Sequence, residues 1–201
     1  MLVLASASPR RRELLWQIGV GHRIAIAGVD ETPRAGEAAA ECVARLALAK
    51  ANKMWTGTLP VLGADTAVVL EGELLGKPTD RHSALSMLER LSGRSHRVLT
   101  AVALVHGGGS DVRLSDSEVR FRDLGATECA LYWDTGEPRD KAGAYAIQGF
   151  GAVFVSELRG SYSAVMGLPL FETAALLDAA GVPRWRHGAR AADGAMIGAG
   201  R

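Results

Sequence analysis

Strand-like and helix-like segments alternate along most of this chain, and the alternation restricts it to a mixed α/β fold. Apolar or alternating runs predict strands at residues 2–7, 22–27, 61–70, 73–75, 97–105, 112–122 and 152–155. Helical spacing of apolar residues predicts helices at residues 9–18, 37–54, 80–91, 127–135 and 168–180. Glu71-Gly72 and the glycines at 107–109 fall between consecutive strands and predict hairpin turns. Part of the sheet should therefore be antiparallel.

The size and composition describe a globular domain. The chain has 201 residues, of which 48% are hydrophobic and 22% are charged. We assign residues 1–183 to one domain, and we expect residues 184–201, which are rich in Ala, Gly and Arg without periodicity, to be a disordered tail. No apolar stretch is long enough for a bilayer and no signal-peptide pattern is present, so we expect a cytoplasmic protein without a membrane partner. A net charge of +1 argues against a stable complex with nucleic acid.

Three consecutive arginines, at positions 10–12, begin the first predicted helix. Ser8 at the N-cap and Pro9 at the first helical position are typical of a helix start. Cations are unfavourable there, because the free N–H groups and the macrodipole already make that end positive. Each arginine alone could simply extend into solvent, but the cluster directly after a strand predicts an anion site, such as one for a phosphate chain.

Asp65 is the most unusual carboxylate in the sequence. It lies within the run at 61–70, where the other residues are apolar or very small except Thr66. A carboxylate in such a strand costs free energy unless it is paired, hydrogen-bonded or bound to a metal. Asp65 is either a buried acceptor for backbone N–H groups or a general base or metal ligand, and the second reading is favoured.

Other polar residues complete a candidate site. Lys50 shares a helical face with Val43 and Leu46, where its amine should emerge at the edge of the core. Lys77 lies in a Gly-Lys-Pro loop, and Glu31 in a short acidic loop. The glycine- and alanine-rich segment at 140–151 suits a flat ligand or a phosphate, although it lacks the P-loop spacing. Such a set predicts binding of a polyphosphate with a divalent cation, followed by hydrolysis between phosphates.

Several blocks of sequence, in order, resemble those of the Maf family of nucleoside triphosphate pyrophosphatases. The blocks are Leu4-Ala5-Ser6-Ala7-Ser8-Pro9-Arg10-Arg11, Val29-Asp30-Glu31, Gly63-Ala64-Asp65-Thr66, Gly76-Lys77-Pro78, Leu91-Ser92-Gly93 with His96 and Thr100, Asp140-Lys141-Ala142-Gly143-Ala144-Tyr145, Ile147-Gln148-Gly149, Gly160-Ser161-Tyr162 and Gly167-Leu168-Pro169-Leu170. The resemblance implies an elongated mixed sheet flanked by helices, with a central cleft, like that of the inosine triphosphate pyrophosphatases. It also implies a homodimer and a divalent cation, Mg²⁺ or Mn²⁺.

The resemblance assigns roles to particular residues. Asp65 matches the family's proton acceptor, and Asp65 with Glu31 would hold the cation. The positions that separate substrate subgroups carry Arg10, Thr66 and Gln148, the set that resembles the dTTP and UTP subgroup. A subgroup acting on 7-methyl-GTP has Trp, Gln and Glu there. The residues that match phosphate-binding positions are Ser6, Arg11, Lys50 and Lys77.

We therefore expect a nucleoside triphosphate pyrophosphatase for dTTP and UTP, and for some modified pyrimidine nucleotides. Asp65 would deprotonate a water molecule that attacks the α-phosphate, leaving pyrophosphate. Two alternatives stay open at this point. One is a nucleotide-sensing regulator of cell division whose hydrolysis is incidental, and the other is an enzyme that removes one phosphate at a time.

Overall fold

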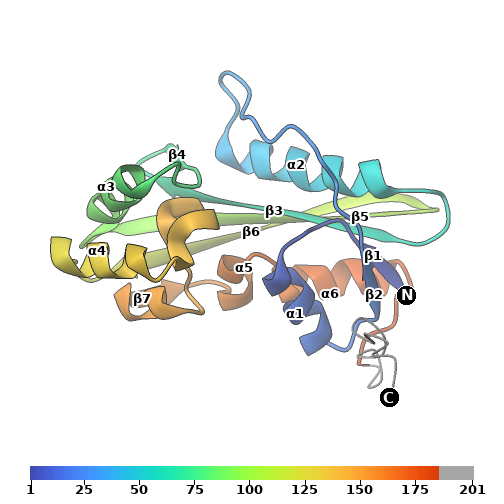
Figure 1. Ribbon diagram of the computed structural model, residues 1–201. Helices are drawn as coiled ribbons and strands as arrows, with labels where there is room; N and C mark the ends of the chain where they lie inside the picture. The colour runs from blue at the N-terminus through green and yellow to red at the C-terminus, as the bar shows by residue number, and fades with distance from the viewer. Residues whose placement is uncertain (186–201) are drawn as a thin grey trace, which may run out of the picture.

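The computed structural model describes residues 1–185, and their strands form one mixed seven-stranded sheet in the order β2-β1-β3-β5-β6-β7, with β4 paired to β3 (Figure 1). The strands are β1 (Leu2–Leu4), β2 (His22–Ile24), β3 (Val61–Leu70), β4 (Glu73–Leu75), β5 (Ser95–His106), β6 (Gly109–Phe121) and β7 (Val155–Arg159). Pairing of β1 with β2 and with β3 is parallel, and every other pairing is antiparallel. The expected elongated mixed sheet is confirmed. The predicted tail lies outside the described residues from position 186 onward.

Helices cover both faces of the sheet. They are α1 (Pro9–Gln17), α2 (Ala39–Met54), α3 (Arg81–Leu91), α4 (Ala126–Asp134), α5 (Tyr162–Met166) and α6 (Leu170–Ala179), with 3₁₀ turns η1 (Glu137–Asp140), η2 (Ala142–Ala144) and η3 (Phe150–Phe154). Figure 1 shows α2 over one face of the long strands, α1, α5 and α6 on the other, and α3 and α4 near one end. Within residues 1–185, no helix has the length and apolar content that a bilayer crossing requires.

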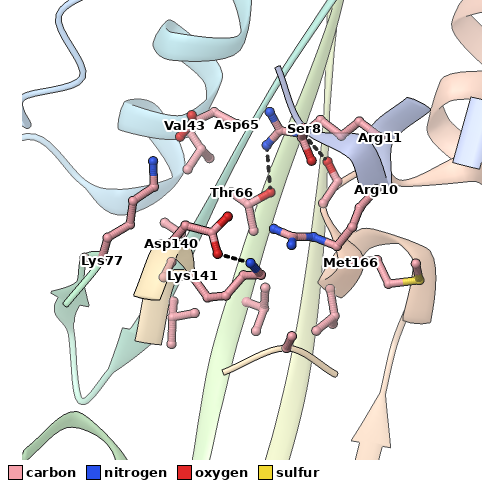
Figure 2. A pocket seen from close by; sticks show the side chains of 18 of the residues that line it. Ser8, Arg10, Arg11, Val43, Asp65, Thr66, Lys77, Asp140, Lys141 and Met166 are labelled. Atoms are coloured by element: carbon pink, nitrogen blue, oxygen red, sulfur yellow. Dashed lines mark hydrogen bonds and ion pairs between the residues drawn. The ribbon is translucent and has the colours of Figure 1, made fainter. Parts of the chain in front are cut away.

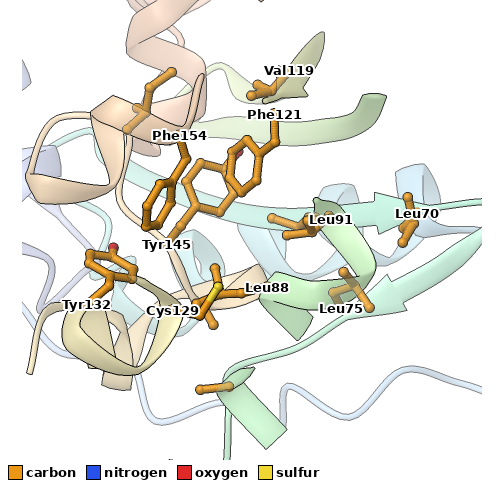
Figure 3. Close-up of a cluster of buried hydrophobic side chains, with 14 of the residues drawn as sticks. Leu70, Leu75, Leu88, Leu91, Val119, Phe121, Cys129, Tyr132, Tyr145 and Phe154 are labelled. Atoms are coloured by element: carbon orange, nitrogen blue, oxygen red, sulfur yellow. The ribbon is translucent and has the colours of Figure 1, made fainter. Parts of the chain in front are cut away.

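The core consists of three apolar clusters. One lies between α2 and the sheet around Val43 and Ala47, and a second lies between the opposite face and α1 and α6 around Leu4 and Leu104. The third fills the end of the molecule near α3 and α4, where aromatic rings including Phe121 pack edge to face (Figure 3). All three clusters meet along β3, which contributes residues to each of them.

One edge of β3 is interrupted in the middle. On one side β3 pairs continuously with β5 from Val61 to Val69. On the other side, β1 pairs only with residues 61 and 62 and β4 only with residues 68–70. Within the described chain, residues 63–67 therefore have no strand partner on that edge. Because side chains alternate between faces, Asp65 and Thr66 at this gap point to opposite sides of the sheet.

Most predicted boundaries agree with the structure to within a few residues, and the β3–β4 hairpin turn is at the expected place. Glu71 and Gly72 both have positive φ, of 51° and 86°, as a two-residue turn that follows the twist of the strands requires. Ser8 is the N-cap of α1 as predicted, but its hydroxyl makes no capping hydrogen bond. Its backbone N–H instead donates to Ser6 Oγ at 3.1 Å.

The strand predicted at residues 152–155 is wrong. Residues 152–154 belong to η3, and only Val155 of the predicted range lies in a strand, β7, which runs on to Arg159. The run is apolar because the turn inserts Phe154, which is fully buried, between Phe121 and Tyr132. The edge strand β7 is mostly polar, since one side of it faces solvent. The predicted helix at 168–180 starts at Leu170, after Pro169. The short helix α5 was not predicted.

Gly63 permits the close approach of α2 to β3 and so sets the position of Lys50 relative to Asp65. A Cβ at Gly63 would collide with the carbonyl oxygen of Ala47 and would lie 2.9 Å from the backbone nitrogen of Ala51. We expect Gly63→Ala to lower the free energy of unfolding by about 2 kcal/mol or more, because helix backbone cannot move aside as a side chain can. Urea denaturation measures the change.

The control is Gly107→Ala in the β5–β6 turn. A Cβ there meets nothing within 4 Å, and the residue does not have positive φ. It should change stability by no more than about 0.5 kcal/mol. Equal effects of the two substitutions would show that the α2–β3 contact tolerates a methyl group.

Candidate functional site

A cavity of about 560 Å³ opens at the unpaired edge of β3 (Figure 2). Its walls come from the start of α1, from α2, from β4 with the loop after it, from the segment 140–148, and from the end of α5. The polar residues that line it are Ser8, Arg10, Arg11, Glu31, Lys50, Asp65, Thr66, Lys77, Asp140, Lys141 and Gln148. A cavity of this size is in the usual range for a small-molecule ligand. The predicted site residues are thus brought together, with the exception of Ser6.

Lys50 lies between two carboxylates. Its Nζ is 2.7 Å from Asp65 Oδ1 and 2.6 Å from Glu31 Oε1. Lys50 belongs to the buried stripe of α2 that packs on the sheet, and only 8% of its side chain is exposed, so it does not extend into solvent as snorkelling would require. Asp65 is 14% exposed, and its ordinary cost of burial is offset by this ion pair. Among residues 1–185 no backbone N–H donates to the Asp65 carboxylate, so that alternative is wrong for the described chain.

Glu31 reaches the same ammonium group from the loop before α2. Partial burial acts to raise the pKa of Glu31, but the hydrogen bond and the charge of Lys50, with Lys77 and Arg11 farther away, together hold that pKa below its ordinary value. The carboxylate is therefore ionised at neutral pH. About half of its side chain is exposed toward the cavity mouth, so it can exchange partners.

Arg11 is fixed by neutral partners. Its Nε donates to the Gly167 carbonyl at 2.8 Å, one terminal nitrogen to Ser6 Oγ at 3.2 Å, and the other to Thr66 Oγ1 at 3.3 Å. Burial lowers the pKa of its guanidinium, and the charge of Asp65 partly opposes that shift. Arg11 retains further N–H groups toward the cavity, because three bonds leave two of its five donors.

Thr66 uses its hydroxyl within the protein. The Thr100 hydroxyl is 2.8 Å from the Ala164 carbonyl, which can only accept, and 3.1 Å from Thr66 Oγ1. Thr100 shares its single hydroxyl hydrogen between these two oxygens, so Thr66 Oγ1 accepts from Thr100 and from Arg11. This network connects α1, β3, β5 and α5. Within residues 1–185 it leaves the Thr66 hydroxyl hydrogen without an acceptor.

The three consecutive arginines do not form one anion site. Arg10 lines the cavity and Arg11 is held beneath it, whereas Arg12 stacks over Trp16, with 4.8 Å from its guanidinium carbon to the ring centroid. A helix turns about 100° per residue, so consecutive side chains must point in different directions. The predicted cluster is therefore wrong for Arg12, whereas Arg10 and Arg11 both line the cavity. Arg10 and Lys77 reach toward the cavity from different walls (Figure 2), and within residues 1–185 neither is in an ion pair.

Ser6 is 8% exposed and does not line the cavity. Its hydroxyl oxygen accepts hydrogen bonds from Arg11 and from the Ser8 N–H. Ser6 therefore holds Arg11 and the start of α1 in place, and its predicted role in phosphate binding stays a prediction. Gly167 and Thr100, which hold the same network, stand in blocks of the family resemblance, but neither has a charged side chain that would predict a place in the site.

The segment 140–148 forms the wall opposite α1. Lys141 pairs with Asp140 at the cavity, and Gln148 is exposed there. Tyr145 lies under this wall, where its hydroxyl is 2.8 Å from His96 Nε2. Burial lowers the pKa of His96 to about 4, so the imidazole is neutral at physiological pH. His96 is thus a buried support for the cavity wall.

The acidic residues fit a divalent cation only in part. No group of three or more acidic, His or Cys side chains among residues 1–185 could hold a metal alone. Glu31 and Asp65 nevertheless converge on one point, the Lys50 ammonium, at the cavity. Mg²⁺ is commonly held by one or two carboxylates together with substrate phosphates, so two carboxylates are sufficient donors once a triphosphate is bound.

Comparison with known proteins identifies close relatives. The family described as Maf-like protein matches residues 1–180. A dTTP/UTP pyrophosphatase of Aromatoleum aromaticum is 54% identical over 198 residues, covering 90% of this chain and 96% of that protein. A dTTP/UTP pyrophosphatase of Methylococcus capsulatus is 55% identical over 179 residues, covering 88% and 89%. A solved HAM1 protein from Coxiella burnetii is similar at 15% identity and a TM-score of 0.48, over 89% of this chain and 98% of that one.

The neutral, buried His96 should make stability depend on pH. Below pH 6.5 the unfolded chain binds a proton at this residue, whereas the folded chain does not until about pH 4. The unfolded state then binds more protons, so the free energy of unfolding should fall as pH drops through this window, by up to about 3 kcal/mol. Urea denaturation between pH 7.5 and 4.5 should show a steeper loss in the wild type than in His96→Gln.

His82→Gln is the matched control, because His82 is exposed on α3. It should keep the pH dependence of the wild type. If His96→Gln also keeps the pH dependence of the wild type, then a neutral, buried His96 is not the cause of that dependence.

Proposed function

The chain belongs to the Maf family, and we propose that it is a nucleoside triphosphate pyrophosphatase that hydrolyses dTTP and UTP to the nucleoside monophosphate and pyrophosphate. The observation that carries this function is the placement of Asp65 at the unpaired edge of β3, inside a cavity that Arg10 and Lys77 also line. Relatives at 54% and 55% identity over most of the chain have this activity in their names. The site supplies the charges that such a reaction needs.

We assign the phosphate chain to the cationic side of the cavity. Arg10 and Lys77 are unpaired within the described residues and reach toward the cavity, and Arg11 offers its two remaining N–H donors from a fixed position. The start of α1 faces the same cavity, where helix N–H groups favour an anion. These groups would stabilise the negative charge that develops on the phosphoryl oxygens.

Asp65 is the proposed general base. Lys50 occupies only Oδ1, and within residues 1–185 no side chain or backbone group bonds to Oδ2. That oxygen is free to accept a proton from a water molecule that attacks the α-phosphate. Oxygen attack there forms the monophosphate and breaks the bond to the leaving pyrophosphate. Lys50 fixes the direction of the carboxylate, which a general base needs.

The proposal includes a divalent cation, Mg²⁺ or Mn²⁺, with Glu31 and Asp65 as its protein ligands. Such a cation supplies charge neutralisation at the phosphates and lowers the pKa of water. Lys50 keeps the two carboxylates from repelling one another, since each lies within 2.7 Å of its ammonium group. This role differs from the phosphate-binding role that the sequence predicts for Lys50.

Base selection is assigned chiefly to Gln148. Its amide both donates and accepts, which matches the O4 and N3–H groups of uracil and thymine. The Thr66 hydroxyl oxygen accepts from Arg11 and from Thr100, which leaves the hydroxyl hydrogen for a bound nucleotide. Arg10 lines the cavity on the α1 side and completes the predicted set of specificity residues.

The reaction is tested by product analysis with UTP and Mg²⁺ or Mn²⁺. The wild type should release UMP and pyrophosphate as primary products. Asp65→Asn should lower kcat by on the order of 10²-fold or more, because the amide cannot accept the proton, while nucleotide binding persists. Chromatography of the products and steady-state kinetics give both results.

Asp111→Asn, at an exposed position on β6, is the control and should match the wild type. UDP and orthophosphate as primary products would contradict the pyrophosphatase assignment. A folded Asp65→Asn variant with the wild-type rate would instead reduce Asp65 to a structural residue, as expected for a nucleotide sensor.

Gln148→Glu tests base selection. The carboxylate at position 148 would repel O4 of uracil and would offer it no hydrogen-bond donor. Leaving O4 unpaired costs about 1–3 kcal/mol of binding free energy. Activity on UTP should therefore fall about 5- to 100-fold relative to 7-methyl-GTP, whose N1–H and amino group can donate to a carboxylate. Steady-state kinetics on both nucleotides measure the ratio, and an unchanged ratio would place base recognition elsewhere.

A further inference from the structure

Glu137 lies next to the cavity wall that carries Gln148, but it is not one of the residues lining the cavity. It is the first residue of η1, and two residues separate it from the end of α4. Its Oε1 accepts from the Tyr132 hydroxyl at 2.7 Å and from the Gly151 N–H at 3.0 Å. Its Oε2 accepts from the Phe150 N–H at 2.9 Å. One carboxylate thus binds two consecutive backbone N–H groups just after Gln148.

The same network reaches the backbone before Gln148. The Tyr132 hydroxyl, while it donates to Glu137, accepts from the Ala146 N–H at 3.1 Å. Tyr132 is 5% exposed and packs edge to face on Phe154, so its ring is held in the core (Figure 3). Residues 146, 150 and 151 are therefore tied to one Glu–Tyr pair. Gln148 is the polar residue between those ties.

The backbone passes very close to this carboxylate. A Cβ at Gly149 would collide with Glu137 Oε2 and lie 2.8 Å from Oε1. Only a residue without a side chain leaves room for the contact, and Gly149 directly follows Gln148. The backbone at residues 149–151 thus packs directly against the Glu137 carboxylate.

Glu137 has no other evident partner. No lysine or arginine among residues 1–185 forms an ion pair with it, whereas Glu128 on the same α4 side pairs with Arg122. A half-buried carboxylate with three donors and no counter-ion has its charge satisfied by the backbone segment itself. Burial raises the pKa of Tyr132, so its hydroxyl remains a proton donor.

We propose that Glu137, acting with Tyr132, is a positioning residue that fixes the Gln148 amide against the nucleobase and thereby determines selection among bases. The proposal rests on the function proposed above, in which Gln148 contacts the base. Glu137 touches neither the base nor the phosphates. It would act by limiting the directions in which Gln148 can offer its donor and acceptor.

The first test uses Glu137→Gln and Tyr132→Phe, both of which keep the shape of the side chain. The preference for UTP over 7-methyl-GTP, as a ratio of kcat/KM values, should fall on the order of tenfold, mainly through a higher KM for UTP. Glu128→Gln is the matched control and should leave the ratio unchanged. A merely structural role would lower activity on both nucleotides equally and so contradict the proposal.

A double-mutant cycle identifies the route of the effect. In a Gln148→Ala background, Glu137→Gln should no longer change the nucleotide preference, because there is no amide left to position. Tyr132→Phe should behave in the same way and serves if Glu137→Gln does not fold. A change in preference that persists in the Gln148→Ala background would overturn the proposal.

Hydrogen exchange tests the network without substrate. The amides of Ala146, Phe150 and Gly151 should exchange on the order of tenfold faster in Tyr132→Phe or Glu137→Gln, and unchanged exchange would overturn the proposal. A wild type that does not hydrolyse UTP would instead overturn the proposed function, and base selection with it. A wild type that is active on UTP, combined with variants of unchanged preference, would overturn only the role of Glu137.

Discussion

The missing strand partner along residues 63–67 is the constraint on which the site depends. A strand with neighbours on both edges would bury Asp65 and Thr66 as it buries the rest of β3. Because β1 ends at Leu4 and β4 starts beyond the gap, the cavity has access to both faces of one strand. The acidic centre with Lys50 then lies on the α2 side, and the Arg11 network on the α1 side. Neighbouring residues of one strand thus serve two different environments.

Charge in this site is arranged in two ways that have different consequences. Lys50 pairs directly with two carboxylates, and these ion pairs offset the burial of all three groups. Arg11 is held instead by neutral oxygens from Ser6, Thr66 and Gly167, so its positive charge is not cancelled locally. An uncancelled, fixed cation is suited to a phosphate group. The two arrangements keep an acidic half and a basic half apart within one cavity.

The sequence predicts local features well and long-range ones only where a motif carries them. The strand at 61–70, its hairpin and the suspect Asp65 follow from apolar patterning and from turn residues that act locally. The ion pair between Lys50 and Asp65 depends on how α2 packs across β3, and the sequence of neither segment alone predicts it. The three arginines mislead because a helix turns about 100° per residue, which directs Arg12 to Trp16 and away from the cavity that Arg10 and Arg11 line. The site residues could be predicted from the resemblance to the family, whereas their different contacts became visible only in the packed structure.

The turn at 150–154 shows why some of the network beside the cavity wall could not be predicted from the sequence. Its apolar residues imitate a strand, since Phe154 must reach the core, and its polar anchor Glu137 is thirteen residues away from Phe150. The anchor also replaces the regular ladder of a strand, because backbone N–H groups that would bond to a neighbouring strand bond to a carboxylate instead. The acidic centre is thus fixed by the contact of α2 with β3, while the wall carrying Gln148 is fixed by the separate network of Glu137 and Tyr132. In the function proposed above, base selection could then change without disturbing the acidic centre.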